Sequence, residues 1–283
     1  GVTPTMTSSS TSTTAIKLVG ETSATIDRAG FQGATTLIAN TAGGGIEVSG
    51  KNPSNSNYKA FEAGGIHTYA LTGPITLIGD GGTGLNAGGT WGKGSLSGSS
   101  SNILLRSNVF SLNNPTIQTT GTITVEPFGD SFTSAISFPI ANLSLPNTIS
   151  GLTIGKSQNT VDITISGSTS VSGPVTLYGG NINIDQNINT TGGAALGDIL
   201  CKASGNIILA ASKSITTSGG DIILWANSDN QTSAGSVALR SSSSIVTGSN
   251  SVTGGHVWIG GGSNGGTWNG LAVGTGYAVP GTA

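Results

Sequence analysis

Three aspartates and a lysine in the last third of the chain, Asp185, Asp198, Asp221 and Lys202, are the residues best suited to acid–base chemistry. Glycoside hydrolysis needs two carboxyl groups roughly 5 to 10 Å apart, one as acid and one as base or nucleophile. If Asp198 and Asp221 occupied equivalent corners of a repeat, they would approach each other. Solvated corner residues explain the same aspartates equally well.

The other residues able to act as acids, bases or ligands are scattered. The 12 Asp and Glu residues occur singly, and the two histidines, His67 and His256, are far apart in the sequence. A single Asp80 does not make the iterated aspartates of a calcium-binding repeat. Cys201 is the one cysteine, which excludes an internal disulfide and a Cys-x-x-Cys site. We therefore predict no catalytic residue, no cofactor and no metal site, in a protein that is not an enzyme.

The composition indicates a folded chain with few charged residues, which makes a charged partner such as nucleic acid unexpected. Hydrophobic residues make up 35% of the 283 residues, which is enough to bury a core, whereas charged residues make up only 8%. The chain has ten Lys and Arg residues and 12 acidic residues, and the basic residues are not clustered in the sequence. The sequence therefore indicates no basic patch that would bind nucleic acid. No apolar run reaches the roughly 18 to 20 residues of a membrane span. We predict neither a nucleic-acid partner nor a membrane span.

The elements that must position these residues are strands. Apolar and polar residues alternate with a period of two in many short segments bounded by Gly, Asn, Ser or Pro, and no helical spacing persists. The clearest segments are 35–40, 74–79, 121–127, 161–166 and 174–180, followed by five similar ones: 179–187, 204–212, 218–230, 234–242 and 254–262.

The five similar segments indicate a solenoid. Aligned on the residue before the first aliphatic position, they start from Asn181, Asn206, Asp221, Ser236 and His256, at unequal spacings. A constant local pattern with variable spacing is expected when strands stack in register and the turns differ in length. We predict an all-β, right-handed parallel β-helix that is continuous over 1–283, with an irregular seam or lateral loop at 128–160.

The pleat of these strands assigns each side chain to the core or to the outer face. Ile222, Leu224 and Ala226 are predicted to face inward, together with the equivalent pairs Ile207 and Leu209, Val237 and Leu239, and Val257 and Ile259. Cys201 is expected in the same core.

The predicted outer face is unusually apolar, with Ile208, Ile223, Ala238, Trp258 and Trp225. Two explanations remain open for it. A lateral loop or a neighbouring region covers the strip, or the strip contacts a glycan or a partner protein. The residues predicted for such a contact are Trp225, Trp258, Trp268 and Tyr178.

The segments GNIILAASKSITTSGGDIILWANSDN and GGHVWIGGGSNGGTWNGLAVGTGYA resemble the repeats of giant bacterial surface adhesins related to filamentous haemagglutinins, in particular long β-strand-repeat proteins of Bacteroidetes. The resemblance covers 172–281 well and the N-terminal part more weakly. It implies a right-handed β-helix stalk, export to the cell surface, and a role in adhesion or surface motility.

We therefore expect a structural stalk segment of an exported, non-catalytic fibre at the bacterial cell surface, and an internal piece of a longer chain. Its expected partners are neighbouring segments of that chain, the secretion machinery, and a surface glycan or protein receptor. A glycan- or protein-binding β-helix module is the alternative, and a polysaccharide lyase or glycosidase is a minor one.

Overall fold

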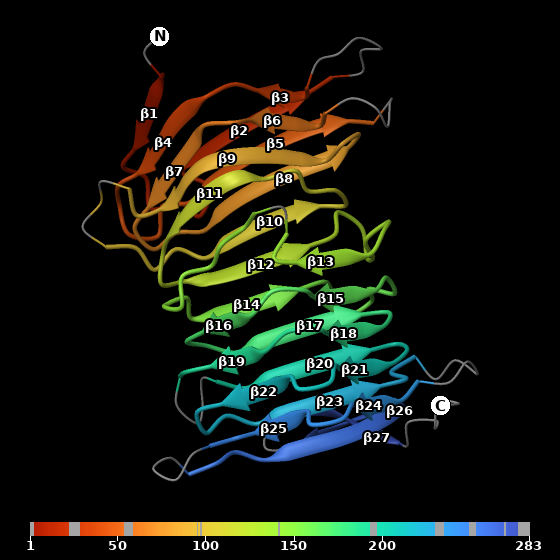
Figure 1. Ribbon diagram of the computed structural model, residues 1–283. Helices are drawn as coiled ribbons and strands as arrows, with labels where there is room; N and C mark the ends of the chain where they lie inside the picture. The colour runs from red at the N-terminus through yellow and green to blue at the C-terminus, as the bar shows by residue number, and fades with distance from the viewer. Residues whose placement is uncertain are drawn as a thin grey trace. The chain divides into compact units, whose positions relative to one another are not determined.

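The computed structural model describes the chain except for residues 1–2, 23–28, 54–58, 95, 97, 141, 193–196, 230–234, 249–252, 269 and 277–283. The described residues form strands and turns without any helix (Figure 1). Strands far apart in the sequence lie side by side in parallel sheets, as the coils of a β-solenoid do. The predicted all-β parallel solenoid is therefore confirmed, whereas its right-handed sense stays a prediction. Because the described residues include no helix, they include no helical segment able to cross a membrane.

Unit 1, one of two compact units, comprises Gly1–Thr133 and Pro139–Ile149. Its chain visits three faces in a constant order, and strands of successive coils pair in parallel. One face contains β2 (Ile16–Glu21), β5 (Ile46–Asn52), β8 (Ile75–Gly81), β10 (Ile103–Ser107) and β12 (Thr122–Glu126). The next contains β3 (Phe31–Gln32), β6 (Phe61–Ala63) and the start of β9 (Leu85–Gly92). The third contains β1 (Thr5–Ser8), β4 (Thr35–Ala39), β7 (Ile66–Ala70), the end of β9, and β11 (Asn113–Gln118).

Unit 2 comprises Ser134–Phe138 and Ser150–Ala283 and has the same three-faced plan. Its first face contains β14 (Gly151–Ile154), β17 (Val175–Gly179), β20 (Ile199–Ala203), β23 (Ile222–Ala226), β26 (Val257–Trp268) and β27 (Leu271–Gly276). The second contains β13 (Ile136–Phe138), β15 (Ile163–Ile165), β18 (Ile182–Ile184), β21 (Ile207–Leu209) and β24 (Val237–Leu239). The third contains β16 (Thr169–Val171), β19 (Ile188–Thr190), β22 (Ser214–Thr217) and β25 (Ser244–Val246).

The core of unit 2 is built from inward rows of β-branched and aliphatic side chains. Ile199 pairs with Ile222, and Cys201 pairs with Leu224, and all four are fully buried. Stacked Ile, Leu and Val side chains suit a pleated surface that is covered from both neighbouring coils. The predicted inward positions Ile222, Leu224, Ala226, Ile207 and Leu209 and the buried Cys201 are confirmed.

The alignment of the five similar segments predicts that they stack on one another on a single face of the solenoid. This prediction is wrong. Ile182, Ile207 and Val237 stack on the second face, whereas Ile199, Ile222 and Val257 stack on the first. Both faces use the same strand pattern, and the turns between them vary in length. The sequence pattern therefore does not distinguish a step to the next face from a step to the next coil.

The last described coil departs from the predicted burial. Val257 and Ile259 keep the inward register of Ile222 and Leu224, yet they are 44% and 49% exposed. Leu239 is in register with the buried Leu209 and is 48% exposed, and Val237 is half-buried. Their prediction as core residues is wrong, because each inward side chain in a solenoid needs a coil on both sides to be covered.

The predicted irregular stretch 128–160 contains just two strands among its described residues, β13 and β14, and the boundaries of the two units fall within it. Its turns still bury apolar side chains, among them Ile140, Leu143 and Ile149. One continuous solenoid over 1–283 remains a prediction.

Candidate functional site

The predicted aromatic contact residues lie on the outer face of the β17–β20–β23–β26 sheet. Tyr178, Lys202 and Trp225 are register partners on successive strands. The Lys202 Nζ atom lies 4.3 Å from the centroid of the Trp225 ring, a cation–π distance. The neighbouring row places Leu200, Ile223 and Trp258 in register.

A strand of the same chain covers this face. After pairing in parallel with β23, β26 turns back through β27, which pairs with it antiparallel. The indole Nε1 of Trp225 donates to the Gly262 carbonyl oxygen at 2.8 Å, and that of Trp258 donates to the Gly274 carbonyl oxygen at 3.0 Å. We call β27, residues Leu271–Gly276, the strap.

Glycine at position 274 allows the strap to lie flat on the tryptophan. A Cβ atom built on Gly274 would lie 2.4 Å from both Cδ1 and Nε1 of Trp225, closer than real Cβ contacts. The result is a small buried cluster of Ile223, Trp225 and Val273, against which Leu200, Trp258, Trp268 and Leu271 pack.

The strap limits how far the predicted contact residues are accessible to a glycan or a partner protein. Trp225 is 5% exposed and faces its own chain. Trp258 and Trp268 are partly buried, with ring centroids 5.2 Å apart, and His256 lies edge-on to Trp268 at 4.9 Å. Tyr178 is half-buried, and burial raises the pKa of its phenol. A covering segment, one of the two explanations for the apolar strip, is therefore present over Ile223, Trp225 and Trp258. The other two strip residues, Ile208 and Ala238, lie apart from it on β21 and β24.

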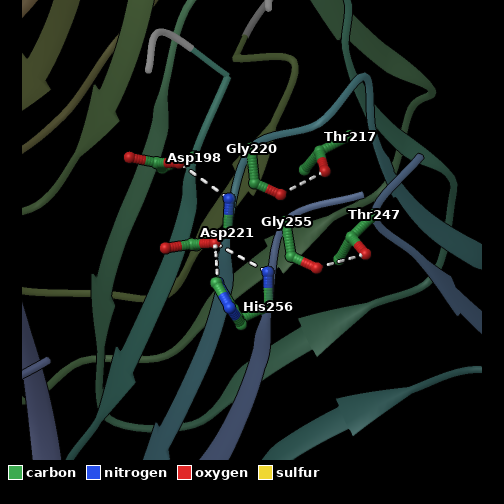
Figure 2. A network of polar contacts seen from close by, with 7 residues as sticks. All are labelled: Asp198, Thr217, Gly220, Asp221, Thr247, Gly255 and His256. Atoms are coloured by element: carbon green, nitrogen blue, oxygen red, sulfur yellow. Dashed lines mark hydrogen bonds and ion pairs between the residues drawn. The ribbon is translucent and has the colours of Figure 1, made fainter. Parts of the chain in front are cut away.

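The aspartates that could form a catalytic pair, Asp198 and Asp221, stand directly before the paired strands β20 and β23 (Figure 2). The Asp198 Oδ1 atom accepts a hydrogen bond from the backbone N–H of Asp221 at 2.7 Å. The Asp221 Oδ1 atom in turn accepts the backbone N–H of His256 at 2.7 Å and lies 3.2 Å from its Nδ1 atom. Asp198 and Asp221 thus occupy equivalent corners, as the sequence allowed. We call Asp198, Asp221 and His256 the carboxylate ladder.

His256 is the member of the ladder that sequence reasoning missed. The sequence names it only as a histidine far from His67, although the alignment of the similar segments gives it the same position as Asp221, directly before a strand. Asp185 and Lys202 do not join the ladder. Asp185 follows β18 on another face, and Lys202 lies against Trp225.

Threonines close the turns that lead into the ladder. The Thr217 hydroxyl donates to the Gly220 carbonyl oxygen, and the Thr247 hydroxyl donates to the Gly255 carbonyl oxygen at 2.8 Å (Figure 2). In the coil before, Thr190 donates to Gly197 in the same manner. Each hydroxyl satisfies a carbonyl next to the ladder residue, so the corner backbone is held from both sides.

Burial raises the pKa of the Asp198 carboxyl, and the Asp221 charge raises it further, while the hydrogen bond from the Asp221 backbone opposes the shift. A raised carboxyl pKa and a second carboxylate are the ingredients of a glycosidase pair. Here, however, the Oδ1 atom of each aspartate is engaged by the next coil's backbone. In the described part of the chain, no group of three or more His, Cys, Asp or Glu side chains is arranged to hold a metal ion.

A second ladder on the β15–β18–β21–β24 face has the same geometry with mostly neutral side chains. The Asp162 Oδ1 accepts the backbone N–H of Asn181 at 2.7 Å, and the Asn181 Oδ1 accepts that of Asn206 at 2.9 Å. The Asn206 Oδ1 then accepts that of Ser236 at 2.9 Å. Amides fill most of the positions that carboxylates fill in the first ladder, so the shared role is to join coils.

Compared with known proteins, the chain matches no family model, no curated protein and no solved structure. Its function must therefore be argued from this geometry.

Proposed function

We propose that this chain is a non-catalytic structural segment of an exported bacterial cell-surface fibre or adhesin, a stalk that supports attachment or surface motility. Its solenoid supplies length and stiffness, and its partners are neighbouring segments of a fibre, the secretion machinery that exports it, and a receptor bound elsewhere on the fibre. The resemblance of its repeats to adhesin repeats supports this assignment.

The carboxylate ladder is the observation on which the non-catalytic assignment rests. A general acid must deliver its proton to a substrate oxygen, and a nucleophile must present a free lone pair to the sugar. In this chain both candidate aspartates direct Oδ1 at a strand N–H of the next coil, at 2.7 Å in each case, so the joining of coils accounts for their placement without a catalytic role, while the Oδ2 atom of each carboxyl keeps its lone pairs. The neutral ladder of Asn181 and Asn206 has the same geometry, so a charge is not needed for the role.

The test is a comparison of the chain with a double variant, Asp198→Asn and Asp221→Asn. Both proteins are incubated with a panel of acidic and neutral polysaccharides, and new reducing ends and unsaturated products are measured. We expect no turnover by either protein and the same circular dichroism spectrum for both. If the unchanged chain cleaves a polysaccharide and the double variant does not, the stalk assignment is wrong and the protein is a lyase or glycosidase.

Surface location is tested separately, in the organism that produces the protein. An antibody raised against the chain should label intact cells, and protease added outside the cells should remove the signal. Labelling that requires permeabilised cells would contradict export.

A binding module is the second candidate, because part of the aromatic strip is not covered. Trp258, Trp268 and the edge-on His256 ring form a small aromatic group that is partly buried, and the side chain of His256 is 62% exposed. Aromatic rings of this kind stack on sugar faces. Glycan-array binding by the chain that Trp268→Ala abolishes would favour this candidate over a passive stalk.

A further inference from the structure

The end of β26 and the strap form a hairpin that is in contact with the carboxylate ladder. We call residues Gly262 to Trp268 of β26, together with the strap, the strap hairpin. His256 stands directly before β26, and Trp268 is the last residue of that strand. Because the hairpin folds back, the rings of these two residues meet, with centroids 4.9 Å apart and an interplanar angle of 77°. A member of the ladder therefore contacts the strap hairpin.

Direct contacts continue from Trp268 to the strap. The rings of Trp268 and Trp258 have centroids 5.2 Å apart, and the Trp258 Nε1 atom donates to the Gly274 carbonyl oxygen at 3.0 Å. Leu271 and Val273 of the strap belong to the same apolar cluster. A change in how firmly His256 holds Trp268 is therefore passed to the strap without an intervening gap.

The charged groups around His256 are few. Its Nδ1 atom lies 3.2 Å from the Asp221 Oδ1 atom, which also accepts its backbone N–H (Figure 2). Asp198 is one coil farther along the ladder, and Lys202 and Tyr178 lie farther along the same sheet face. In the sequence from 241 to 276, His256 is the only titratable side chain. The strap hairpin thus has no charge of its own, and Asp221 is the nearest charge to the histidine ring among the described residues.

We propose that His256 is a pH-sensitive latch on the strap hairpin, which protonation of the imidazole closes and deprotonation loosens. A neutral imidazole donates from one ring nitrogen, whereas the protonated ring donates from both. With both nitrogens protonated, Nδ1 forms an ion pair with the Asp221 carboxylate and fixes the ring in the orientation that contacts Trp268. This inference goes beyond the proposed stalk role and does not depend on it.

The direction of the pH effect follows from the charges. The ion pair needs a protonated histidine, so its contribution is present at low pH and is lost as the pH rises and the ring releases its proton. Histidine side chains usually change charge between about pH 5 and pH 8. Raising the pH through this interval should therefore loosen the hairpin.

The apolar outer face of β23 is what the latch would control. Trp225 is held under the hairpin by its hydrogen bond to the Gly262 carbonyl oxygen at 2.8 Å, and Ile223 lies beside it in the cluster. A loosened hairpin exposes both side chains to solvent. A closed hairpin keeps them covered.

Hydrogen–deuterium exchange of the whole 283-residue chain, read by mass spectrometry at pH 6 and pH 8, tests the latch. Protection factors are compared, because they remove the direct effect of pH on the exchange chemistry. Peptides from the strap hairpin should be about two- to fivefold more protected at pH 6, as expected for a partly exposed ion pair. Peptides from β17 should show no such difference and serve as the internal reference.

Two variants remove the ion pair and keep the backbone bond. His256→Gln retains the N–H that Asp221 accepts, and Asp221→Asn retains an oxygen acceptor for it. Each should abolish the pH dependence and leave the hairpin as loosely protected as at pH 8. If one of them fails to fold, as judged by circular dichroism, the other carries the test.

The controls change the other groups that could titrate. His67→Gln makes the same substitution at the second histidine, in unit 1, and Asp198→Asn neutralises the ladder carboxyl that bonds Asp221 instead of His256. Both should keep the pH dependence. The proposal is overturned if hairpin protection is equal at the two pH values or lower at pH 6, if His256→Gln keeps the dependence, or if either control removes it. The polysaccharide assay is independent of all these outcomes.

Discussion

At the scale of single residues, Cys201 reports on the integrity of the core. Its thiol is buried between Leu177 and Leu224 in the inward row, and burial raises its pKa to about 12. The thiolate is the reactive form of cysteine, and the fold disfavours it.

We predict that Cys201 does not react with a soluble thiol reagent at neutral pH until the protein unfolds. The pKa of the thiol is near 9.0 in the unfolded chain, while the folded thiol stays protonated to about 12. The stability that the buried thiol contributes is therefore complete below pH 9.0 and is lost as the pH rises toward 12. The rate of labelling against denaturant concentration should follow the unfolding curve, and fast labelling of folded protein would contradict the burial.

The charge of Asp198 gives a second prediction at this scale. Asp198→Asn keeps an oxygen acceptor for the Asp221 N–H, as Asn181 does for Asn206. Because the folded pKa of Asp198 is raised, its ionised form is disfavoured in the fold, and the penalty is present at neutral pH.

Asp198→Asn should therefore be at least as stable as the unchanged chain at pH 7. The difference should vanish as the pH falls below the unfolded pKa, where both side chains are neutral. Asp198→Ala removes the acceptor and should cost about 1 kcal/mol at the lower pH, and less than that at pH 7, because it also removes the penalty of the ionised carboxyl. Denaturant unfolding at two pH values measures both effects, and a larger loss for Asn than for Ala would rule out the acceptor role.

At the scale of elements, displacement of the strap can be followed by tryptophan fluorescence, because the strap covers Trp225. Gly274→Val places a side chain where Trp225 lies and should displace β27 from the outer face. Trp225 then becomes exposed, so tryptophan emission should shift to the red and quenching by iodide should increase. Gly129→Val is the control, because a Cβ there meets no atom within 4 Å. Unchanged emission from Gly274→Val would show that the strap does not cover Trp225.

The strands were predictable from the sequence, and the strap was not. Alternation of Ile, Leu and Val with polar residues located β4, β8, β12, β15 and β17 within one or two residues of their bounds. The strap reads as one more glycine-rich strand, since nothing in Leu271–Gly276 distinguishes antiparallel from parallel pairing. The alignment of the five similar segments placed His256 at the same position as Asp221, and the structure joins these two residues in the ladder. Its use of a single face for all five segments was wrong, because they occupy two faces.

At the scale of the whole molecule, each coil depends on the coils beside it. Leu224 is buried in the inward row with Cys201 on one side and Ile259 on the other. A carboxylate at this position has no partner, and its burial costs several kcal/mol.

We predict that Leu224→Asp lowers the free energy of unfolding by at least about 3 kcal/mol. Asn183→Asp places a carboxylate on the half-buried outer side of β18 and should change stability by less than about 1 kcal/mol. Thermal melting followed by circular dichroism compares the two. Equal melting temperatures would contradict this assignment of the two faces, and a lower melting temperature for Asn183→Asp would mean that the faces are inverted.

The two ladders have a genetic consequence. Their hydrogen-bonded partners are separated by 19, 25 and 30 residues in one ladder and by 23 and 35 in the other, so the corner residue recurs while the intervening length drifts. Codons inserted within a turn leave every strand in phase with its neighbours. One codon inserted within a strand shifts the rest of that strand by one residue, so its inward side chains turn outward and its outward side chains turn inward. A gene of this type is therefore free to lengthen by duplicating whole coils and to vary in its turns, while small insertions within its strands are removed by selection.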